Sequence, residues 1–225
     1  MIRWENITKK YKNGTVALDS VNLTVEGSGF VFLVGPTGSG KTTLLRLVIR
    51  DILPSEGKLF IDDTEITKMR KGKIPQIRRK MGFIFQDLKL LSDRSVWENV
   101  ILPLEILGKK KGEIEEKGNE VLKTVGIIKK INCYPVQLSG GELQRAAIAR
   151  ALISEPEIIL ADEPTADLDP KISLEIMEIL EKINKNGTTI IMATHNEKIV
   201  EKMKKRVIRI EDGKIIKDQK EGKYD

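Results

Sequence analysis

Residues 30–49 read FVFLVGPTGSGKTTLLRLVI, and this stretch decides the fold. The five apolar residues from Phe30 to Val34 are typical of a buried strand, and a glycine-rich turn follows them. A helical pattern then runs from Thr42 to Ile49. Strand, glycine-rich turn and helix in this order form the first half of a βαβ unit. The sequence therefore predicts an α/β core.

The turn from Gly35 to Thr42 matches the spacing of a phosphate-binding P-loop throughout. Its glycines let the backbone curl so that successive amides point at phosphate oxygens, and the following helix adds its positive end. We expect Lys41 to reach the β- and γ-phosphates of a nucleotide and Thr42 to supply a hydroxyl to Mg²⁺. A glycine-rich loop without a ligand is the alternative, but the flanking strand and helix favour the P-loop.

Two carboxylates follow a second buried strand, which we expect from Ile158 to Ala161. Open α/β sheets place ligands at the carboxyl ends of their strands, so Asp162 and Glu163 are predicted to lie near the P-loop. We expect Asp162 to hold Mg²⁺ directly or through water, and Glu163 to polarise an attacking water. Adjacent acids at a strand end are often only solvated loop, and the P-loop makes that alternative weaker.

The rest of the pattern inserts a helical lobe into the α/β core. Between about residue 88 and Pro156 apolar residues recur at spacings of three and four, which is typical of helices. The N-terminal part, up to about Phe32, alternates as strands do, and Asp212-Gly213 indicates a hairpin. We expect helices at 42–49, 95–107, 114–125, 141–153 and 171–183, and strands at 16–18, 21–25, 30–34, 81–85, 158–161, 188–192, 207–210 and 214–217.

A second anion-binding turn is predicted at Ser139-Gly140-Gly141, which opens the helix expected at 141–153. Exposed amides and the helix dipole act together at such a turn. Taken alone, the turn is better explained as an ordinary serine helix cap.

In combination, the P-loop, the Asp162-Glu163 pair and the segment Leu138–Arg145 resemble the ATP-binding-cassette (ABC) family of ATPases, whose signature reads LSGGQ. Here Glu142 replaces the usual Gln, which is tolerable because Ser139 and the backbone amides bind the phosphate. The resemblance implies a P-loop NTPase core with an N-terminal antiparallel β-subdomain, at 1–87 and 157–225. It also implies an inserted α-helical subdomain at 88–156.

The resemblance assigns further residues. Tyr11 resembles the aromatic that stacks on adenine, Gln86 the glutamine that contacts Mg²⁺ or water, and His195 the switch histidine that hydrogen-bonds the γ-phosphate. The loop Ala166–Asp169 resembles the one that crosses the dimer interface. The catalytic residues implied are Glu163, His195 and Gln86, and the metal-binding residues are Thr42, Gln86 and Asp162. The ATP-binding residues implied are Tyr11, Gly35, Pro36, Thr37, Gly38, Ser39, Gly40, Lys41, Thr42, Thr43, Gln86, Ser139, Gly140, Gly141 and Asp162.

The family also implies an assembly. The signature turn lies in the helical lobe, remote from the P-loop of its own chain, and so completes the site of a second copy. Two ATP molecules are then enclosed between two chains arranged head to tail. ATP binding closes this homodimer and hydrolysis opens it.

Residues 86–103, QDLKLLSDRSVWENVILP, resemble the FtsE type of cell-division ATPase within the family. This type implies a membrane partner of FtsX type, moved by ATP cycling to activate cell-wall hydrolases. Leu88, Leu90, Leu91 and Trp97 would then lie near the groove for the partner's cytoplasmic helix, or they form the core of the lobe. The alternative is the ATPase of a lipoprotein-release or macrolide-export transporter.

Composition limits the remaining possibilities. The chain has 225 residues, a net charge of +6 and a single cysteine, which favours one domain without a disulfide or cysteine metal cluster. No apolar run reaches the roughly 20 residues of a membrane span, and residues 1–6 lack the apolar core of a signal peptide. We therefore expect a cytoplasmic protein, peripheral on the inner face of the membrane through its partner.

Two rival functions are weaker. Chromosome-structuring ATPases carry a long coiled coil between P-loop and signature, whereas here fewer than one hundred residues without heptads separate Lys41 from Ser139, so no nucleic-acid partner is expected. A subunit that binds ATP without hydrolysing it is disfavoured by Glu163 and His195. A GTPase or small-molecule kinase would leave the signature helix unexplained.

Overall fold

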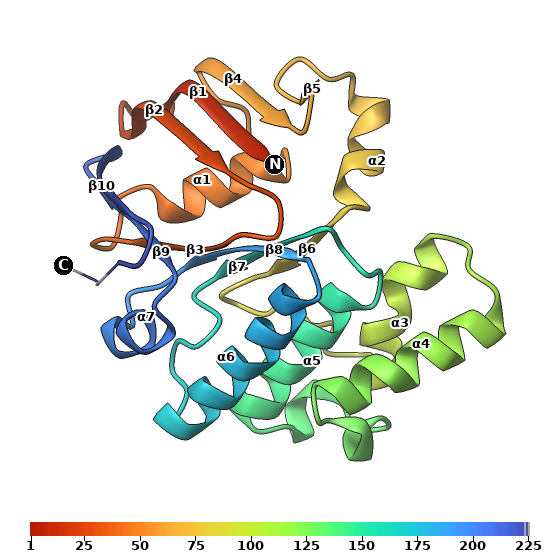
Figure 1. The fold of residues 1–225 in the computed structure, drawn as a ribbon. Helices are drawn as coiled ribbons and strands as arrows, with labels where there is room; N and C mark the ends of the chain where they lie inside the picture. Colours follow the sequence, from red (N-terminus) through yellow and green to blue (C-terminus); the bar gives the residue numbers. More distant parts are fainter. Residues whose placement is uncertain (223, 225) are drawn as a thin grey trace.

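Two sheets and a group of helices build the chain, as the computed structural model of residues 1–222 and 224 describes it (Figure 1). A six-stranded sheet has the strand order β10-β9-β3-β8-β7-β6. A four-stranded sheet has the order β2-β1-β4-β5 and lies above it in Figure 1, with α1 between the two. Helices α3 to α6 cover the opposite face of the six-stranded sheet.

The six-stranded sheet is parallel except for β10, which pairs antiparallel with β9. Its three central strands are buried at every residue, as expected for strands covered on both faces. The strands are β3 (Phe30–Val34), β6 (Met81–Ile84), β7 (Ile158–Asp162), β8 (Thr189–Ala193), β9 (Arg206–Glu211) and β10 (Lys214–Gln219).

Strand β3 shows how alternation divides the core. Phe30, Phe32 and Val34 pack with the helices below the sheet, whereas Val31 and Leu33 pack with α1 and the four-stranded sheet. Successive side chains of a strand point to opposite faces, so one apolar run serves two separate clusters. The P-loop, which follows Val34, is thereby held at the carboxyl edge of the sheet.

The four-stranded sheet corrects one prediction. Strands were expected at 16–18 and 21–25 with turn residues between them, but β2 (Val16–Val25) is continuous. The polar pair Asp19-Ser20 lies at a shift in register, where Ser20 has a φ of 52° and its amide donates to Thr8 Oγ1 at 3.0 Å. A bulge therefore absorbs residues that resemble a turn. The other strands are β1 (Ile2–Lys10), β4 (Glu56–Ile61) and β5 (Thr64–Glu65).

The five predicted helices are confirmed with ends that differ by one to three residues. Strand β4 was not predicted because its first three residues, Glu56, Gly57 and Lys58, are exposed and not apolar. Strand β5 and helices α2 and α7 were not predicted because they are too short to show a clear period. The helices are α1 (Lys41–Val48), α2 (Ile74–Arg78), α3 (Val96–Ile106), α4 (Lys111–Thr124), α5 (Gly140–Leu152), α6 (Pro170–Lys185) and α7 (Glu197–Met203). None of the helices in the described residues is long and apolar enough to cross a membrane.

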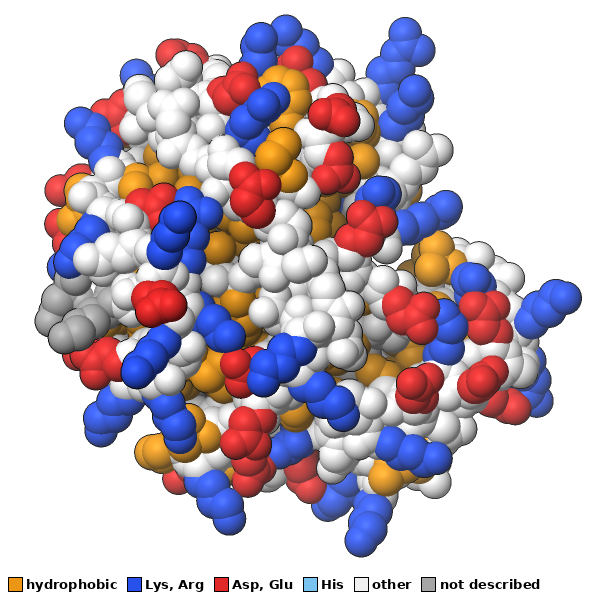
Figure 2. Space-filling model, viewed as in Figure 1, with side chains coloured by type: hydrophobic (Ala, Val, Ile, Leu, Met, Phe, Trp, Pro, Cys, Tyr) orange, Lys and Arg blue, Asp and Glu red, His pale blue; other side chains and the backbone are white. Residues whose placement is uncertain are grey.

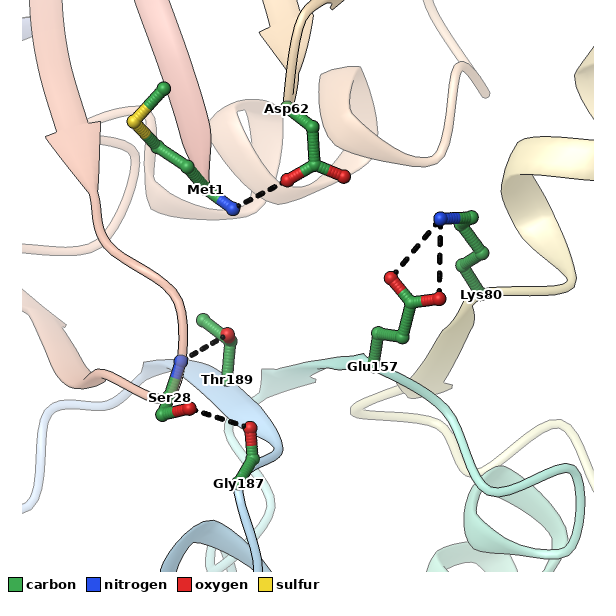
Figure 3. A network of polar contacts seen from close by, with 7 residues as sticks. All are labelled: Met1, Ser28, Asp62, Lys80, Glu157, Gly187 and Thr189. Atoms are coloured by element: carbon green, nitrogen blue, oxygen red, sulfur yellow. Dashed lines mark hydrogen bonds and ion pairs between the residues drawn. The ribbon is translucent and has the colours of Figure 1, made fainter.

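A cavity of about 670 Å³ lies at the amino ends of β7 and β8, opposite the edge that carries the P-loop. The groups drawn in Figure 3 satisfy one another: the Met1 amine contacts Asp62 at 2.8 Å, and Ser28 bonds to Thr189 Oγ1 and to the Gly187 carbonyl, each at 2.9 Å. Lys80 pairs with Glu157 at 3.2 Å. This paired network makes the cavity a weaker candidate for chemistry than the opposite edge.

Candidate functional site

The P-loop ends in a helix N-terminus that has no side-chain cap. Gly40, the residue before α1, has a φ of 110°, and a Cβ there would lie 2.3 Å from the Ala17 carbonyl oxygen, so only glycine fits. Within the described residues, the amides of Gly38, Gly40 and Lys41 donate to no other group of the chain. Free amides at the positive end of a helix form an anion site.

Lys41 is folded over this loop. Its ammonium donates to the carbonyls of Gly35 at 2.8 Å and Pro36 at 2.9 Å. Burial lowers the pKa of Lys41, and the nearby carboxylates of Glu163 and Asp162 oppose that shift. Ser39 Oγ is buried without a partner among the described residues. A phosphate would give the ammonium and the hydroxyl the charged partner that they lack.

Asp162, the last residue of β7, meets the first turn of α1. Its Oδ1 accepts a hydrogen bond from Thr42 Oγ1 at 3.0 Å. Burial raises the pKa of the Asp162 carboxyl, and the bond from Thr42 opposes the rise. A cation bound here would favour the ionised form.

The donors at this point suit Mg²⁺, since a carboxylate and a hydroxyl are hard oxygen ligands. No group of three or more His, Cys, Asp or Glu side chains in the described part of the chain forms a metal site. An ion held by Thr42 and Asp162, with Gln86 at the same sheet edge, would take its remaining ligands from phosphate oxygens and water, as Mg²⁺ commonly does.

Glu163 turns away from the adjacent Asp162 because its backbone is left-handed, with a φ of 50°. Its carboxylate contacts His195 twice: Oε1 lies 3.0 Å from Nδ1, and Oε2 accepts from the His195 amide at 3.3 Å. The Glu163 side chain is 12% exposed and that of His195 67%. Such strained φ values cluster at functional sites. The structure thus brings together two of the three predicted catalytic residues.

Gln86, the third, lies two residues beyond β6, whose Ile84 pairs with Ala161 of β7. This register places Gln86 at the same carboxyl edge as Asp162 and Glu163. Its side chain is exposed, and the described residues give it no hydrogen bond to the P-loop or to Asp162.

Tyr11 lies between β1 and β2, against the first turn of α1. Its hydroxyl is 3.4 Å from Thr43 Oγ1, and the Lys9 ammonium lies 5.3 Å from the centre of its ring. The ring is half-buried. Tyr11 therefore stands next to the P-loop, and its stacking on adenine stays a prediction.

The signature turn begins α5 with a capping box. Glu142 Oε2 accepts from the Ser139 amide at 2.9 Å and from the Ser139 hydroxyl at 3.0 Å, while Ser139 Oγ accepts from the Glu142 amide at 3.4 Å. These bonds, and the ion pair with Lys130, lower the pKa of Glu142. Ser139 is exposed, and no hydrogen bond or ion pair of the described residues joins residues 139–141 to the P-loop.

The two glycines of this turn differ in what they require. A Cβ on Gly141 would lie 2.8 Å from Ile172 Cγ2, so packing against α6 demands glycine there. A Cβ on Gly140 would meet only Leu168 at an ordinary 3.6 Å. Nothing inside the chain demands glycine at 140, which leaves room for a group from outside.

The loop Ala166–Asp169 connects the two halves of the proposed site. The Ala166 amide donates to the Glu163 carbonyl at 3.1 Å, and Leu168 lies beside Gly140. Asp167 and Asp169 are exposed. The loop thus runs within one chain from Glu163 to the signature turn.

The four apolar residues of the 88–97 segment are not equivalent. Trp97 packs tightly against α4, since a Cβ on Gly118 would lie 2.5 Å from its ring. Leu90 also packs against the core, whereas Leu91 is 39% exposed. For Trp97 the structure favours the core interpretation over the groove.

Sequence reasoning missed two cations. Arg150 of α5 donates to the carbonyls of Leu88 and Lys89, each at 2.6 Å, and these consecutive residues have φ values of 58° and 51°. Lys130 pairs with Glu142 at 3.2 Å. No sequence signal marked either residue, because both contacts depend on how distant segments pack.

Comparison with known proteins gives concordant matches. The sequence model of the ABC transporter family matches residues 18–166. The chain is 44% identical over 224 residues to the cell division ATP-binding protein FtsE of Bacillus subtilis, covering 100% of this chain and 98% of that protein. It is 40% identical over 215 residues to FtsE of Escherichia coli, covering 96% and 97%.

Among solved structures, the fold matches the dimeric ATP-binding cassette MJ0796 in a post-hydrolysis state bound to ADP and Pi. The TM-score is 0.92 at 37% identity, with 99% of each chain covered. A second dimeric structure of the same cassette gives a TM-score of 0.92 at 38% identity.

Proposed function

Because this chain belongs to the ABC transporter family of ATPases, we propose that it hydrolyses ATP as the nucleotide-binding subunit of an FtsEX-type cell-division complex. The contact between Thr42 and Asp162 carries the proposal, because it joins the P-loop to the end of β7. The acids of β7 therefore stand where the phosphates of a bound ATP would lie. The lipoprotein-release or macrolide-export alternative is weaker, since the two relatives matched by sequence, from Bacillus subtilis and Escherichia coli, are cell-division proteins.

We assign the phosphate-binding step to Lys41 and the free amides of the P-loop, with Tyr11 against the adenine. Thr42, Asp162 and Gln86 would hold Mg²⁺, which when bound neutralises developing charge on the phosphates. Glu163 takes a proton from the attacking water while the oxygen of that water bonds to the γ-phosphorus. The bond between the γ-phosphorus and the β–γ bridging oxygen breaks, the bridging oxygen stays with ADP, and ADP and phosphate leave. His195 orients Glu163 and donates to the γ-phosphate.

We assign the second half of each site to a second copy of the chain. Ser139 and Gly140 are exposed, and none of residues 139–141 is bonded to its own P-loop, so the turn is free to meet the γ-phosphate bound by a partner. In this assignment the lobe at 88–156 is a subdomain that carries the signature, and 1–87 with 157–225 form the core. The dimeric cassettes matched by the fold support a paired arrangement.

We assign a membrane partner of FtsX type, which would hold the chain at the inner face of the membrane. Exposed Leu91, between the Gln86 loop and α3, is the better probe of this contact, because replacing Trp97 would disturb the packing against Gly118. On the face drawn in Figure 2, Lys and Arg alternate with Asp and Glu, so this face lacks the basic stripe that is typical of a nucleic-acid site.

The test combines activity with partner capture. Purified chain should release phosphate from Mg-ATP, and Leu91→Glu should lose co-purification with the FtsX-type partner while keeping that activity. Ile216→Glu, on β10 and 53% exposed, is the matched control and should retain the partner. Absence of ATP turnover both alone and with the partner would contradict the hydrolytic assignment, and equal partner loss in both variants would contradict the docking assignment.

A further inference from the structure

Two helices of the lobe begin with the same Ser-x-x-Glu capping box. In α3, Glu98 Oε2 accepts from the amide and the hydroxyl of Ser95, each at 2.8 Å. In α5, Glu142 bonds Ser139 in the same way. The boxes differ in what the carboxylate meets next, because Glu142 pairs with Lys130 and Glu98 forms no ion pair among the described residues.

The backbone around Lys130 is fixed by the start of α3. The Cys133 amide donates to the Lys130 carbonyl at 2.9 Å and closes a turn. The carbonyls of Cys133 and Ile131 accept from the amides of Val96 at 2.8 Å and Trp97 at 3.0 Å. The same turn therefore caps α3 and presents a cation to the signature of α5.

The position of Glu142 creates an electrostatic conflict in the assembled dimer. Its carboxylate already occupies the positive end of α5 and holds the Ser139 hydroxyl, with Oε1 directed to Lys130 at 3.2 Å. A γ-phosphate that reaches the same turn brings a second anion to it, and the two repel. Enclosure between two chains removes the water that would otherwise screen this repulsion.

We propose that Lys130 neutralises Glu142 and thereby sets how tightly the signature turn binds the ATP held by the partner chain. This inference rests on the proposed function, since it needs the signature to act between chains. Lys130 is a positioning residue that acts through Glu142. ATP-dependent dimerisation then depends on whether the negative charge of Glu142 is neutralised by Lys130, rather than on the capping hydrogen bonds.

The pair predicts an order of affinities in a Glu163→Gln background, which keeps ATP bound. Lys130→Gln leaves Glu142 unpaired and should weaken ATP-dependent dimerisation about tenfold, roughly threefold at each of two equivalent turns. Glu142→Gln keeps an oxygen that caps Ser139 but removes the charge, and should dimerise at least as tightly as the parent. The double variant should return to within about twofold of the parent.

The experiment measures the dimer dissociation constant by sedimentation at saturating Mg-ATP, at about 50 mM and about 0.5 M salt. The Lys130→Gln loss should shrink at high salt, because screening weakens a charge effect and leaves packing unchanged. Lys130→Arg should behave as the parent. Glu98→Gln, in the matched box of α3, should change dimerisation less than twofold (about the error of the method).

The outcomes separate the inference from the function beneath it. A parent that dimerises while Lys130→Gln changes nothing, or is not rescued by Glu142→Gln, overturns the role of the pair and leaves the proposed function intact. A parent that stays monomeric with ATP overturns this inference together with the assignment of the signature turn to a second copy, whereas ATP hydrolysis is tested separately by phosphate release. Retention of the parent's thermal unfolding temperature by Lys130→Gln shows that a loss of dimer reflects charge rather than misfolding.

Discussion

The P-loop and the signature turn are two helix N-termini that are capped in opposite ways. Before α1, Gly40 offers no side-chain cap, and the amides around it are free within the described residues. Before α5, Ser139 and Glu142 satisfy each other, and the turn is already closed by the chain's own carboxylate. Gly40 and Lys41 are buried at the sheet edge, whereas Ser139 and Gly140 are exposed.

From this difference we predict the order in which the two turns bind the phosphates of ATP. A free N-terminus with Lys41 folded over it can accept phosphates within a single chain. A capped N-terminus must loosen a capping interaction worth about 1 kcal/mol before it accepts another anion. We therefore expect ATP to bind the P-loop of one chain strongly and the signature of the other only on dimerisation.

The largest expected effect is that of Glu163→Gln, which should separate ATP hydrolysis from ATP binding at the edge of the sheet that carries the P-loop. Glu163→Gln removes the proton acceptor and should slow phosphate release about a thousandfold while ATP still binds. A phosphate-release assay and a titration with fluorescent ATP check the two halves. Turnover close to that of the parent would show that another group takes the proton.

The next effect tests whether nucleotide affinity belongs to the P-loop alone. Lys41→Ala removes a charged phosphate partner and should weaken ATP binding to the monomer about a hundredfold. Ser139→Ala is the matched change at the other turn and should leave monomer affinity within about twofold, by calorimetry. Equal losses of ATP affinity in both variants would show that the signature turn also contributes to ATP binding by the monomer.

The two glycines of the signature turn allow its role in dimerisation to be separated from its role in folding. Gly140→Ala has room inside the chain and should fold as stably as the parent, but crowd the partner's phosphate and weaken dimerisation about tenfold. Gly141→Ala meets Ile172 and should instead lower the free energy of unfolding by about 1–3 kcal/mol. Denaturant melts and sedimentation distinguish them, and similar behaviour of both variants would contradict the distinction.

The smallest effect concerns Asp162, whose pKa is raised by burial. A carboxyl with a raised folded-state pKa destabilises the fold when ionised, so its proton is held more tightly in the folded state than in the unfolded state. Asp162→Asn should therefore raise the unfolding temperature of the nucleotide-free protein at neutral pH by about 2–4 °C. The gain should vanish as the pH falls through the range in which Asp162 becomes protonated. A lower unfolding temperature at neutral pH would show that Thr42 and Lys41 already compensate the charge.

The P-loop and the signature turn also differ in how much of their structure can be predicted from the sequence. The strand, P-loop and helix at 30–49 were predictable because their signals are local and continuous, and Asp162 follows a strand equally clear. The Ser-x-x-Glu spacing at Ser139 and Glu142 is the pattern of a capping box, so the capping role of Glu142 is predictable from the sequence. Lys130 and Arg150 were not predictable, because their partners lie 12 and about 60 residues away and only packing joins them.

If a signature turn completes the P-loop site of another chain, two chains with defects in different halves of the site should complement each other when they are mixed. In the Glu163→Gln background, one chain carries Lys41→Ala and lacks a working P-loop, while the other carries Ser139→Arg and lacks a working signature. Each alone should remain monomeric with ATP, and the mixture should form a heterodimer containing one complete site. A mixture that stays monomeric at about a hundred times the concentration at which the parent dimerises would contradict the claim.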